Sequence, residues 1–456
     1  MHLSEKKSCA TFRSEMSERD ASAKGPRKVL IIGAGFAGLE CAQKLANDSR
    51  FEVTIIDRNN HHLFQPLLYQ VATASLAASD IARSIRQVLT KAKNVTVLMD
   101  EISAIDSDGK TANGKSGTVY HYDTLLLAAG ARTGYFGRDE WAEHTLGLKT
   151  LAEAQTVRRT VLSNLEKAEL TTDPEERKRL MTVVIIGGGP TGVELAGAFA
   201  DLIHRSLKED FRRIDTSKLR VLLLEGADRI LAVYDPDQSA YTKDRLTKDG
   251  VEVLTSTKVV NISKGRAELE DGTVLESEAI IWAAGVAANP LTTMLGVPTD
   301  RGGRITPNPD LSLPGKPDIF VAGDLVAILD EKGKPVPGVA PAASQMGRHV
   351  AKVLKEDARL EKTQFSGDKA SLRPKFSYWD KGFMAIIGKN HAVVKAGNMR
   401  VKGFIAWVMW LFIHILFLIG FRNKLSVLLG WAFSYIRDNP EARVIVNRPG
   451  SVAKQA

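Results

Sequence analysis

A strand-like run that meets a glycine-rich turn and then a helical pattern constrains the fold of this chain more than any other feature. Residues 29–32 are Val-Leu-Ile-Ile, Gly33, Gly35 and Gly38 form Gly-x-Gly-x-x-Gly, and apolar residues then recur at helical spacing. In such a unit the glycines allow a tight turn and the approach of a pyrophosphate, to which the helix N-terminus presents free N–H groups. We therefore predict a dinucleotide site here.

The next apolar run supports this prediction because it ends in an acid. Residues 51–56 read as a strand, and Asp57 follows them, 24 positions after Gly33. A carboxylate near that spacing can accept hydrogen bonds from a ribose. The alternative is a glycine-rich turn of an α/β domain that binds nothing.

The same unit occurs again 154 positions later. A second Gly-x-Gly-x-x-Gly begins at Gly187 after four apolar residues, and the strand-like run 220–224 ends on Glu225. We attribute the longer interval of 38 positions to a polar insert at about 205–218, which lengthens the helix or the loop after it. Two such units predict two dinucleotides and a pair of doubly wound, Rossmann-like α/β domains.

Glu225 also indicates which nicotinamide cofactor binds. A carboxylate can hold the ribose hydroxyls of NADH but repels the 2′-phosphate of NADPH. Gly226 and Ala227 offer no cation to a phosphate, whereas Arg229 lies near enough to oppose the preference. The sequence favours NADH.

Glu194 lies in the helix that follows the second turn. A carboxylate near a helix N-terminus is stabilised by the helix dipole, which is a sufficient structural reason for it. The functional alternative is a group that handles protons beside the reaction centre.

Three further apolar runs, at 125–127, 280–282 and 318–321, are expected to be strands. Small residues at a strand end let the chain cross closely over a ligand, and a carboxylate there suits hydrogen bonding to a sugar-alcohol chain. The residues that follow these runs are Ala129 and Gly130, Ala284 and Gly285, and Gly323 and Asp324. For the first two runs, the alternative is simply a buried strand and turn.

Residues 109–116 match the Gly-x4-Gly-Lys-Ser pattern of a phosphate-binding loop. That loop needs a buried strand before it and a helix that starts at the Lys-Ser pair. Here the preceding residues are polar, and Thr118-Val119-Tyr120 follow. We predict a solvated hairpin turn instead.

Between the first unit and this turn we expect a helix at about 81–89 and strands at 95–98 and 118–122. The adjacent His61 and His62 cannot point the same way on an extended segment, so we predict no metal role for them. The apolar cluster around Pro66 could wall a ring-shaped ligand.

A stiff proline-rich loop after residue 335 leads into a helix. Gln345 is the one neutral hydrogen-bonding group in a run of small residues there. It could contact a ligand carbonyl or merely cap the backbone.

Composition narrows the chemistry. The only cysteines are Cys9 and Cys41, without a Cys-x-x-Cys pair, which excludes dithiol redox chemistry and favours a reducing compartment. We expect Cys41 to be a small buried residue and residues 1–26 to be a polar tail without a secretory signal. From residue 371 onward there are 13 Lys and Arg against 3 Asp and Glu, so the basic excess faces one anionic partner, a membrane or a nucleic acid.

Residues 404–421 form an uncharged apolar run with basic residues on both sides. Eighteen residues are marginal for a membrane span, which needs about 20. The alternatives are helices that lie in the membrane interface, or a dimer-forming core helix. Because Trp and Tyr accompany the basic residues, we favour interfacial helices, with the span second, and an anionic lipid surface rather than nucleic acid.

Together these features resemble the single-subunit type II NADH:quinone oxidoreductases, which belong to the flavoproteins with two dinucleotide-binding domains. The resemblance covers about residues 27–435. It rests on both glycine units, on Phe64-Gln65-Pro66-Leu67-Leu68-Tyr69, on Phe320-Val321-Ala322-Gly323-Asp324, on 340–347 and on the apolar, basic C-terminus.

The resemblance implies a membrane-associated flavoenzyme that passes two electrons from NADH through FAD to a membrane quinone, without pumping protons. It implies a homodimer bound monotopically to the cytoplasmic side of the inner membrane. The FAD-binding domain would comprise 27–150 and 300–370, the NADH-binding domain 151–299 and the membrane-binding domain 371–456. Rival readings are a flavin-binding redox sensor that uses NADH slowly, or another pyridine-nucleotide flavoprotein reductase.

It also implies the site residues. Glu194 and Gln345 are the catalytic candidates, and no metal ligand is expected. For FAD they are Gly33, Gly35, Phe36, Ala37, Gly38, Asp57, Arg58, Gln65, Ala129, Gly130, Gly323 and Asp324. For NADH they are Gly187, Gly189, Pro190, Thr191, Gly192, Glu194, Glu225, Ala284 and Gly285, and for the quinone Ala342, Gln345 and Met346.

Overall fold

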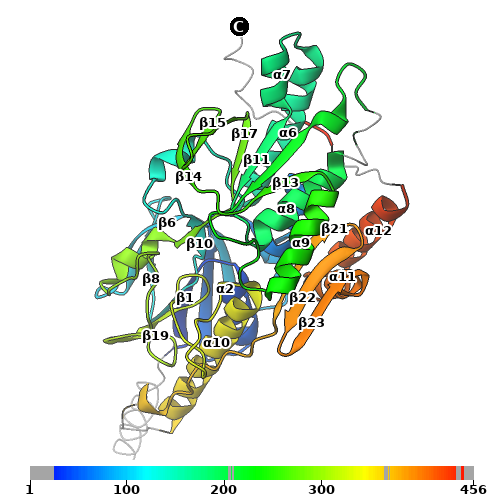
Figure 1. The fold of residues 1–456 in the computed structure, drawn as a ribbon. Helices are drawn as coiled ribbons and strands as arrows, with labels where there is room; N and C mark the ends of the chain where they lie inside the picture. The colour runs from blue at the N-terminus through cyan, green and yellow to red at the C-terminus, as the bar shows by residue number, and fades with distance from the viewer. Residues whose placement is uncertain are drawn as a thin grey trace, which may run out of the picture.

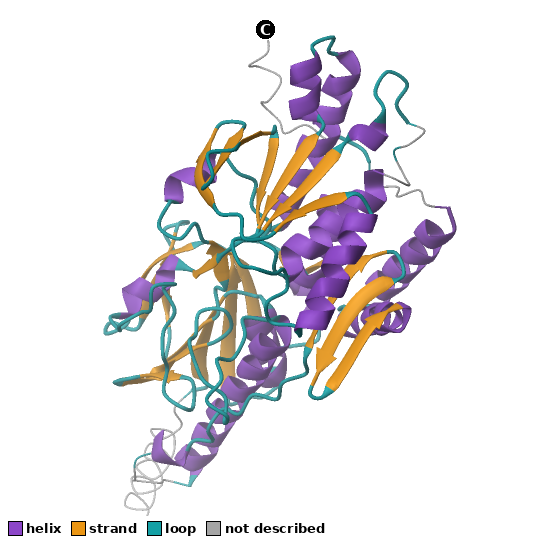
Figure 2. Ribbon diagram, viewed as in Figure 1, coloured by secondary structure: helices purple, strands orange, loops and turns teal. Residues whose placement is uncertain are grey.

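The fold is described from a computed structural model, drawn in Figure 1 and coloured by secondary structure in Figure 2. It describes residues 25–445 except 204–206, 208–209, 364–367, 369 and 438–442. The predicted N-terminal tail therefore lies outside the described residues, apart from its last two positions, and so does Cys9. Cys41 is buried on α2, as predicted.

The first sheet has six strands in the order β19-β20-β9-β1-β2-β5. Its strands are β1 (Arg27–Ile32), β2 (Phe51–Asp57), β5 (Val95–Met99), β9 (Thr124–Leu127), β19 (Ser312–Leu313) and β20 (Lys316–Val321). All pairings are parallel except that of β19 with β20. The chain therefore returns after almost two hundred residues to complete the sheet on which the first glycine turn lies.

Two helices that are far apart in sequence lie together against this sheet, α2 (Phe36–Leu45) and α10 (Ala340–Lys362) (Figure 1). They pack backbone to backbone, because a Cβ on Gly347 would lie 2.0 Å from the carbonyl oxygen of Ala37. The start of α10 is thereby held beside the first glycine turn.

A small antiparallel sheet of β6 (Ile102–Asp106), β7 (Thr111–Gly114) and β8 (Val119–His121) holds the segment that mimics a phosphate loop. The N–H of Gly114 bonds to the Thr118 oxygen at 2.9 Å, so a hairpin turn follows Gly114, and no helix begins there. The predicted turn is correct at this end, whereas residues 111–114 are themselves a strand.

The second sheet is fully parallel, in the order β13-β12-β11-β17. Its strands are β11 (Thr182–Ile186), β12 (Arg220–Leu224), β13 (Val251–Leu254) and β17 (Ala279–Trp282). Around it lie α6 (Leu151–Leu170), α7 (Pro174–Leu180), α8 (Pro190–Asp201), α9 (Pro236–Lys248) and a hairpin sheet of β14 (Val259–Ser263), β15 (Arg266–Leu269) and β16 (Val274–Glu276) (Figures 1 and 2). Both predicted glycine units are therefore strand–turn–helix units of parallel sheets.

The two sheets are linked by the pairing of β10 (Ala131–Thr133) with β18 (Val286–Ala288). Both short strands follow the small-residue strand ends predicted from the sequence. The insert before Glu225 is not part of α8, which ends at Asp201. Its described residues contain only the short turn η4 (Thr216–Lys218) as a regular element.

One predicted helix is wrong. Residues 81–89 form the end of α4 (Ala78–Ile81), strand β4 (Ala82–Ser84) and α5 (Ile85–Val88). β4 pairs with β3 (His61–Leu63), and this pairing with a distant segment overrides the local helical pattern. The strands expected at 95–98 and 118–122 are present as β5 and β8.

The C-terminal part is an antiparallel sheet of β21 (Phe383–Gly388), β22 (His391–Ala396) and β23 (Met399–Gly403), followed by α11 (Phe404–Phe417) and α12 (Phe421–Arg437). It lies alongside α8 and α9 (Figure 1). A Cβ on Gly197 of α8 would lie 1.6 Å from the carbonyl oxygen of Ile387, so α8 rests directly on β21.

The apolar run at 404–421 is divided between two helices that meet at Gly420, where φ is +93°. Among the described helices none is both long and apolar enough to cross a bilayer. The region therefore contains helices too short for the span that ranked second, and their position in a membrane interface stays a prediction.

Candidate functional site

The first glycine turn is a tight cradle with open space above it. Gly33 has φ +101°, and a Cβ there would lie 2.4 Å from the Ala128 oxygen. A Cβ on Gly38 would lie 1.9 Å from the Gly33 oxygen, whereas a Cβ on Gly35 would meet no atom within 4 Å. The protein itself therefore requires Gly33 and Gly38, and the space at Gly35, before the N-terminus of α2, fits a pyrophosphate.

Asp57 holds this turn in place. Its Oδ2 accepts from the Ala34 N–H at 2.8 Å, and its Oδ1 accepts from the Asn59 N–H at 2.8 Å. Each carboxylate oxygen keeps a second lone pair, so the side chain can still accept from ribose hydroxyls. Phe36 and Ala37 open α2, and Arg58 follows Asp57 at the same edge of the sheet.

The remaining predicted FAD residues lie after strands of the same sheet or beside it. Ala129 and Gly130 follow β9, while Gly323 and Asp324 follow β20, so both pairs lie at carboxyl ends of parallel strands. The Gln65 amide donates to the Lys149 oxygen at 3.1 Å.

Sequence reasoning missed two groups here. The Lys149 ammonium lies 3.8 Å from the Asp324 carboxylate, and neither is more than a quarter exposed. His62 is 2% exposed, and its Nδ1 lies 2.9 Å from the Ala34 oxygen. Because a carbonyl only accepts, the proton is on Nδ1. The buried Nε2 has no hydrogen-bond partner among the described residues. Both contacts join segments far apart in sequence, so no local pattern announces them.

The second glycine turn repeats the geometry of the first. Gly187 has φ +113°, a Cβ on Gly192 would lie 1.9 Å from the Gly187 oxygen, and a Cβ on Gly189 would meet no atom within 4 Å. Pro190 and Thr191 open α8. The protein therefore has two cradles of the same shape, which fit two dinucleotides.

Glu225 is held as Asp57 is. Its Oε2 accepts from the Gly188 N–H and its Oε1 from the Ala227 N–H, both at 2.7 Å. The Arg229 guanidinium donates to the oxygens of Tyr234 and Ala232. The cation that opposed the predicted preference for NADH is thus occupied with backbone carbonyls. Ala284 and Gly285 follow β17 and pass close to Gly187 and Gly134.

The residues expected to contact a quinone lie on α10 and are mostly core. Ala342 and Met346 are 1% and 2% exposed, and the Met346 sulfur faces the Gly323 N–H at 3.2 Å. The Gln345 amide donates to the Trp379 oxygen at 3.0 Å and accepts from the Trp379 N–H at 2.9 Å. Of the two roles left open for Gln345, backbone capping is the one that this structure shows.

A cavity of about 630 Å³ lies between α3 (Leu68–Ala72), α8, β21, α11 and α12. We call it the Trp410 cavity. Most of its lining is aromatic or aliphatic and includes Tyr69, Trp407, Trp410 and Trp431, and Glu194 is part of the same wall. Ala342, Gln345 and Met346 are not among its lining residues.

Burial in this wall raises the pKa of Glu194 to about 8, and the Ile386 N–H and the Trp410 indole oppose the rise. The side chain is therefore mostly protonated at neutral pH, whereas the structural alternative required a carboxylate stabilised by the helix dipole. His414 donates from Nδ1 to the Trp410 oxygen at 2.8 Å and stacks on the indole. Burial lowers its pKa to about 4, so it is neutral.

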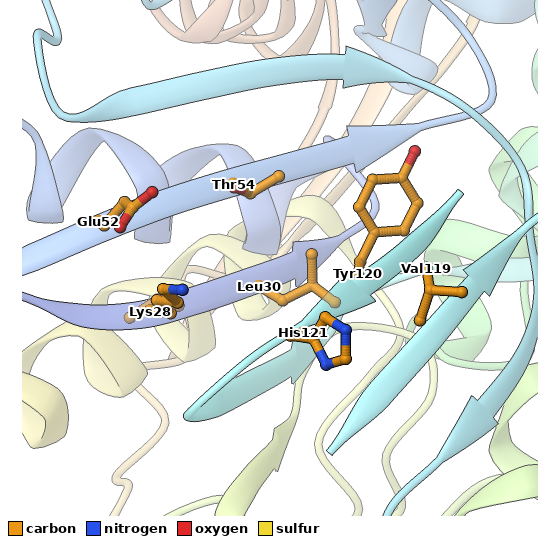
Figure 3. Close-up of a pocket in the computed structure, with 8 residues that line it drawn as sticks. Lys28, Leu30, Glu52, Thr54, Val119, Tyr120 and His121 are labelled. Atoms are coloured by element: carbon orange, nitrogen blue, oxygen red, sulfur yellow. The ribbon is translucent and has the colours of Figure 1, made fainter. Parts of the chain in front are cut away.

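A smaller cavity of about 240 Å³ lies beside β1, β2 and β8 (Figure 3). Lys28, Glu52 and His121 line it, together with apolar residues. It lies beside the amino-terminal halves of β1 and β2, whereas the glycine turns follow the carboxyl ends of their strands, where such sheets bind ligands. Among the described residues no cluster of His, Cys, Asp or Glu is arranged to hold a metal.

Comparison with known proteins gives a consistent result. The family model described as pyridine nucleotide-disulphide oxidoreductase matches residues 27–347. The chain is 40% identical over 432 residues to the type II NADH:quinone oxidoreductase Ndh of Mycobacterium tuberculosis, covering 92% of this chain and 90% of that protein. It is 28% identical over 440 residues to an internal alternative NAD(P)H-ubiquinone oxidoreductase of Arabidopsis thaliana mitochondria, covering 91% of this chain and 86% of that one.

Two solved structures have the same fold. NDH2 of Plasmodium falciparum, determined in complex with NADH, superposes with a TM-score of 0.81 at 20% identity and covers 92% of this chain and 100% of its own. The sulfide:quinone oxidoreductase of Aquifex aeolicus gives a TM-score of 0.67 at 18% identity, covering 88% of this chain and 92% of its own.

Proposed function

We propose a function from one premise: this chain belongs to the pyridine nucleotide-disulphide oxidoreductase family and, within it, to the type II NADH:quinone oxidoreductases. It transfers two electrons from NADH to a quinone, so that NADH, a proton and the quinone become NAD⁺ and the quinol. Bound FAD would supply the redox chemistry that links oxidation of NADH to two-electron reduction of the quinone. The proposal includes no proton pumping.

The first cradle is the proposed FAD site. The N–H groups at the start of α2, beside the open space at Gly35, would hold the pyrophosphate. Asp57 would accept hydrogen bonds from the ribose, and Asp324 from the sugar-alcohol chain. The Lys149 ammonium, 3.8 Å from Asp324, offers the site a positive charge.

The second cradle is the proposed NADH site, with the start of α8 at the pyrophosphate and Glu225 at the ribose. Glu194 lies in the second turn of the same helix. One rigid helix therefore carries both the nucleotide-binding N-terminus and the acid of the Trp410 cavity.

We place the quinone ring in the Trp410 cavity. The aromatic lining excludes water and suits an apolar ring, and the protonated Glu194 can supply one of the two protons that quinone reduction consumes. A quinone contact for Ala342, Gln345 and Met346 stays a prediction. Ala342 and Met346 are buried, and the Gln345 amide bonds to the Trp379 backbone.

We further propose that α11 and α12 lie on the membrane surface. Their exposed side chains include Ile405, Phe412, Phe421 and Leu429, and Phe421 is 81% exposed. Basic residues between and around the helices would face anionic lipid. Attachment on the cytoplasmic side, the homodimer and the division into FAD (27–150, 300–370), NADH (151–299) and membrane (371–456) domains stay predictions.

The observation that carries this proposal is the pair of matching glycine cradles whose second helix brings Glu194 into an aromatic cavity. A visible spectrum of the purified protein, reconstituted with FAD, tests it. The flavin band should bleach with NADH and recover with a quinone. A protein that takes up no FAD, or stays reduced with quinone, contradicts it, and a turnover below about one per second favours the redox sensor.

A further inference from the structure

Three side chains in the wall of the Trp410 cavity form a short hydrogen-bonded row. The Trp431 indole N–H donates to Gln70 Oε1 at 2.8 Å, and Gln70 Nε2 donates to the Tyr69 hydroxyl oxygen at 2.8 Å. Tyr69 is 4% exposed and Gln70 is 7% exposed, and all three residues line the cavity.

The direction of this row is fixed by chemistry. An indole N–H can only donate, so the Gln70 oxygen must face Trp431 and its NH₂ group must face Tyr69. The Tyr69 oxygen is therefore the acceptor, and the proton of its hydroxyl remains to be donated elsewhere. Within the part of the chain that the structure describes, the hydroxyl accepts from Gln70 and donates no hydrogen bond of its own.

This hydroxyl stays protonated throughout the physiological range. Burial, and then the negative charge that Glu194 and Asp201 can carry, hold the pKa of Tyr69 well above its usual value. A buried donor without an acceptor costs free energy unless a ligand completes the bond. The hydroxyl is thus a preset donor in a wall that is mostly apolar.

We propose that the Tyr69 hydroxyl donates a hydrogen bond to a carbonyl oxygen of the quinone, and that Gln70 and Trp431 are positioning residues that aim it. This inference rests on the proposed function. It separates two tasks in one cavity, with Tyr69 orienting the ring and Glu194 holding a proton.

The row also ties the donor to the surface helices. Trp431 is on α12, which is fixed to α4 because the Asn423 amide donates to the oxygens of Ser79 and Asp80, both at 2.9 Å. Tyr69 and Gln70 are on α3. The contact of α12 with α4 therefore holds the Trp431 indole that orients the Gln70 amide toward Tyr69.

Tyr69→Phe tests the inference because it removes only the hydroxyl and keeps the ring that packs against Trp410 at 6.4 Å. In the FAD-loaded enzyme we expect the KM for a short-chain quinone to rise about three- to tenfold, the usual range for one lost hydrogen bond. Flavin reduction by NADH, followed without quinone, should keep its rate.

Two further variants make the test specific. Trp431→Phe should raise the same KM by a smaller factor, because Gln70 loses the group that orients it. Tyr122→Phe removes the hydroxyl of another tyrosine that is 4% exposed and does not line the cavity, and that donates to the Asp106 oxygen at 3.4 Å. This variant should change neither the quinone KM nor the rate of flavin reduction.

A second electron acceptor distinguishes a loss of quinone binding from general damage to the fold. Phenazine methosulfate has no carbonyl oxygen, so its reduction should be equally fast in the wild type and in Tyr69→Phe. An unchanged quinone KM, or an equal loss with both acceptors, overturns the inference. Failure of the wild type to reduce any quinone overturns the proposed function instead.

Discussion

Gln345 holds both backbone groups of Trp379 with its single side-chain amide, at 3.0 Å and 2.9 Å. This clamp joins α10, which lies on the first sheet, to the segment that leads into β21. Gln345 was predicted from the sequence as a candidate contact of a quinone carbonyl. Its amide instead bonds to the backbone of Trp379.

We predict that Gln345→Leu lowers the free energy of unfolding by about 1–2 kcal/mol, because two backbone hydrogen bonds lose their partner. Urea denaturation measures this. Gln345→Glu keeps the acceptor and should lose about half as much. A quinone KM that rises while stability stays unchanged would favour the direct quinone contact instead.

Gly35→Ala should reduce FAD binding without harming the protein itself. Gly35 has φ −70°, which alanine adopts freely, and its Cβ would meet no protein atom. Only a bound pyrophosphate would meet the new methyl group. We expect at least a tenfold weaker FAD affinity by flavin fluorescence, with an unchanged melting temperature of the apoprotein.

Gly189→Ala is the matched control in the second cradle. Its φ of −72° is equally permissive, and the space around it is equally open. This variant should retain its FAD and show a KM for NADH raised by a similar factor. Loss of FAD from Gly189→Ala would show that the two cradles are assigned the wrong way round.

Glu225→Gln should weaken the preference for NADH over NADPH by about tenfold or more, because the charge that repels a 2′-phosphate is removed. The ratio of kcat/KM for the two cofactors measures it. Arg229→Gln is the control and should leave that ratio unchanged, since its guanidinium is bonded to backbone oxygens.

The raised pKa of Glu194, about 8, predicts two pH dependences. Quinone reduction should slow as pH rises through about 8, because the carboxyl then has no proton to give. The folded state also binds this proton more tightly than the unfolded chain, whose pKa is about 4.5. The contribution to stability is therefore full below about 4.5 and declines as pH rises to about 8.

Glu194→Gln should remove both effects. Denaturation of the wild type and the variant at about pH 5, 7 and 9 measures the second. The stability of the wild type should fall more between pH 5 and 9 than that of Glu194→Gln. An equal fall, or a smaller one, would contradict a protonated Glu194.

Phe412→Glu together with Phe421→Glu should release the protein from lipid vesicles. These side chains are 66% and 81% exposed. A carboxylate at either position opposes insertion at the boundary between headgroups and acyl chains and is repelled by anionic lipid. Sedimentation with phosphatidylglycerol vesicles measures binding, and flavin reduction by NADH should not change. Leu170→Glu, at a position 72% exposed on α6, is the control and should bind as the wild type does.

The sequence predicted correctly those elements whose structure depends on residues close together in the chain. The two glycine units could be read from sequence because strand, turn and helix follow one another, and each steric demand is met within a few residues or by the neighbouring strand. The same holds for the division of the apolar C-terminus into helices. The helix expected at 81–89 was wrong because β4 pairs with β3. The local helical periodicity carries no information about this pairing with a distant segment.

The candidate site was harder to predict, because its walls come from distant segments. The row of Trp431, Gln70 and Tyr69 spans more than three hundred positions. His62 contacts the Ala34 oxygen although α2 and β2 lie between them in the chain. Glu194 was singled out, but its raised pKa depends on β21 and α11, which pack over it only in the folded protein. Contacts of this kind leave no periodic trace.

The absence of a side chain at Gly197 lets α8 touch β21 at van der Waals distance. Truncation of the chain before residue 380 would therefore expose the face of α8 that packs against β21. This is the helix that carries Glu194. The C-terminal part forms a wall of the Trp410 cavity and is more than a membrane anchor. Truncated variants should therefore misfold or lose turnover, and not only lose membrane binding.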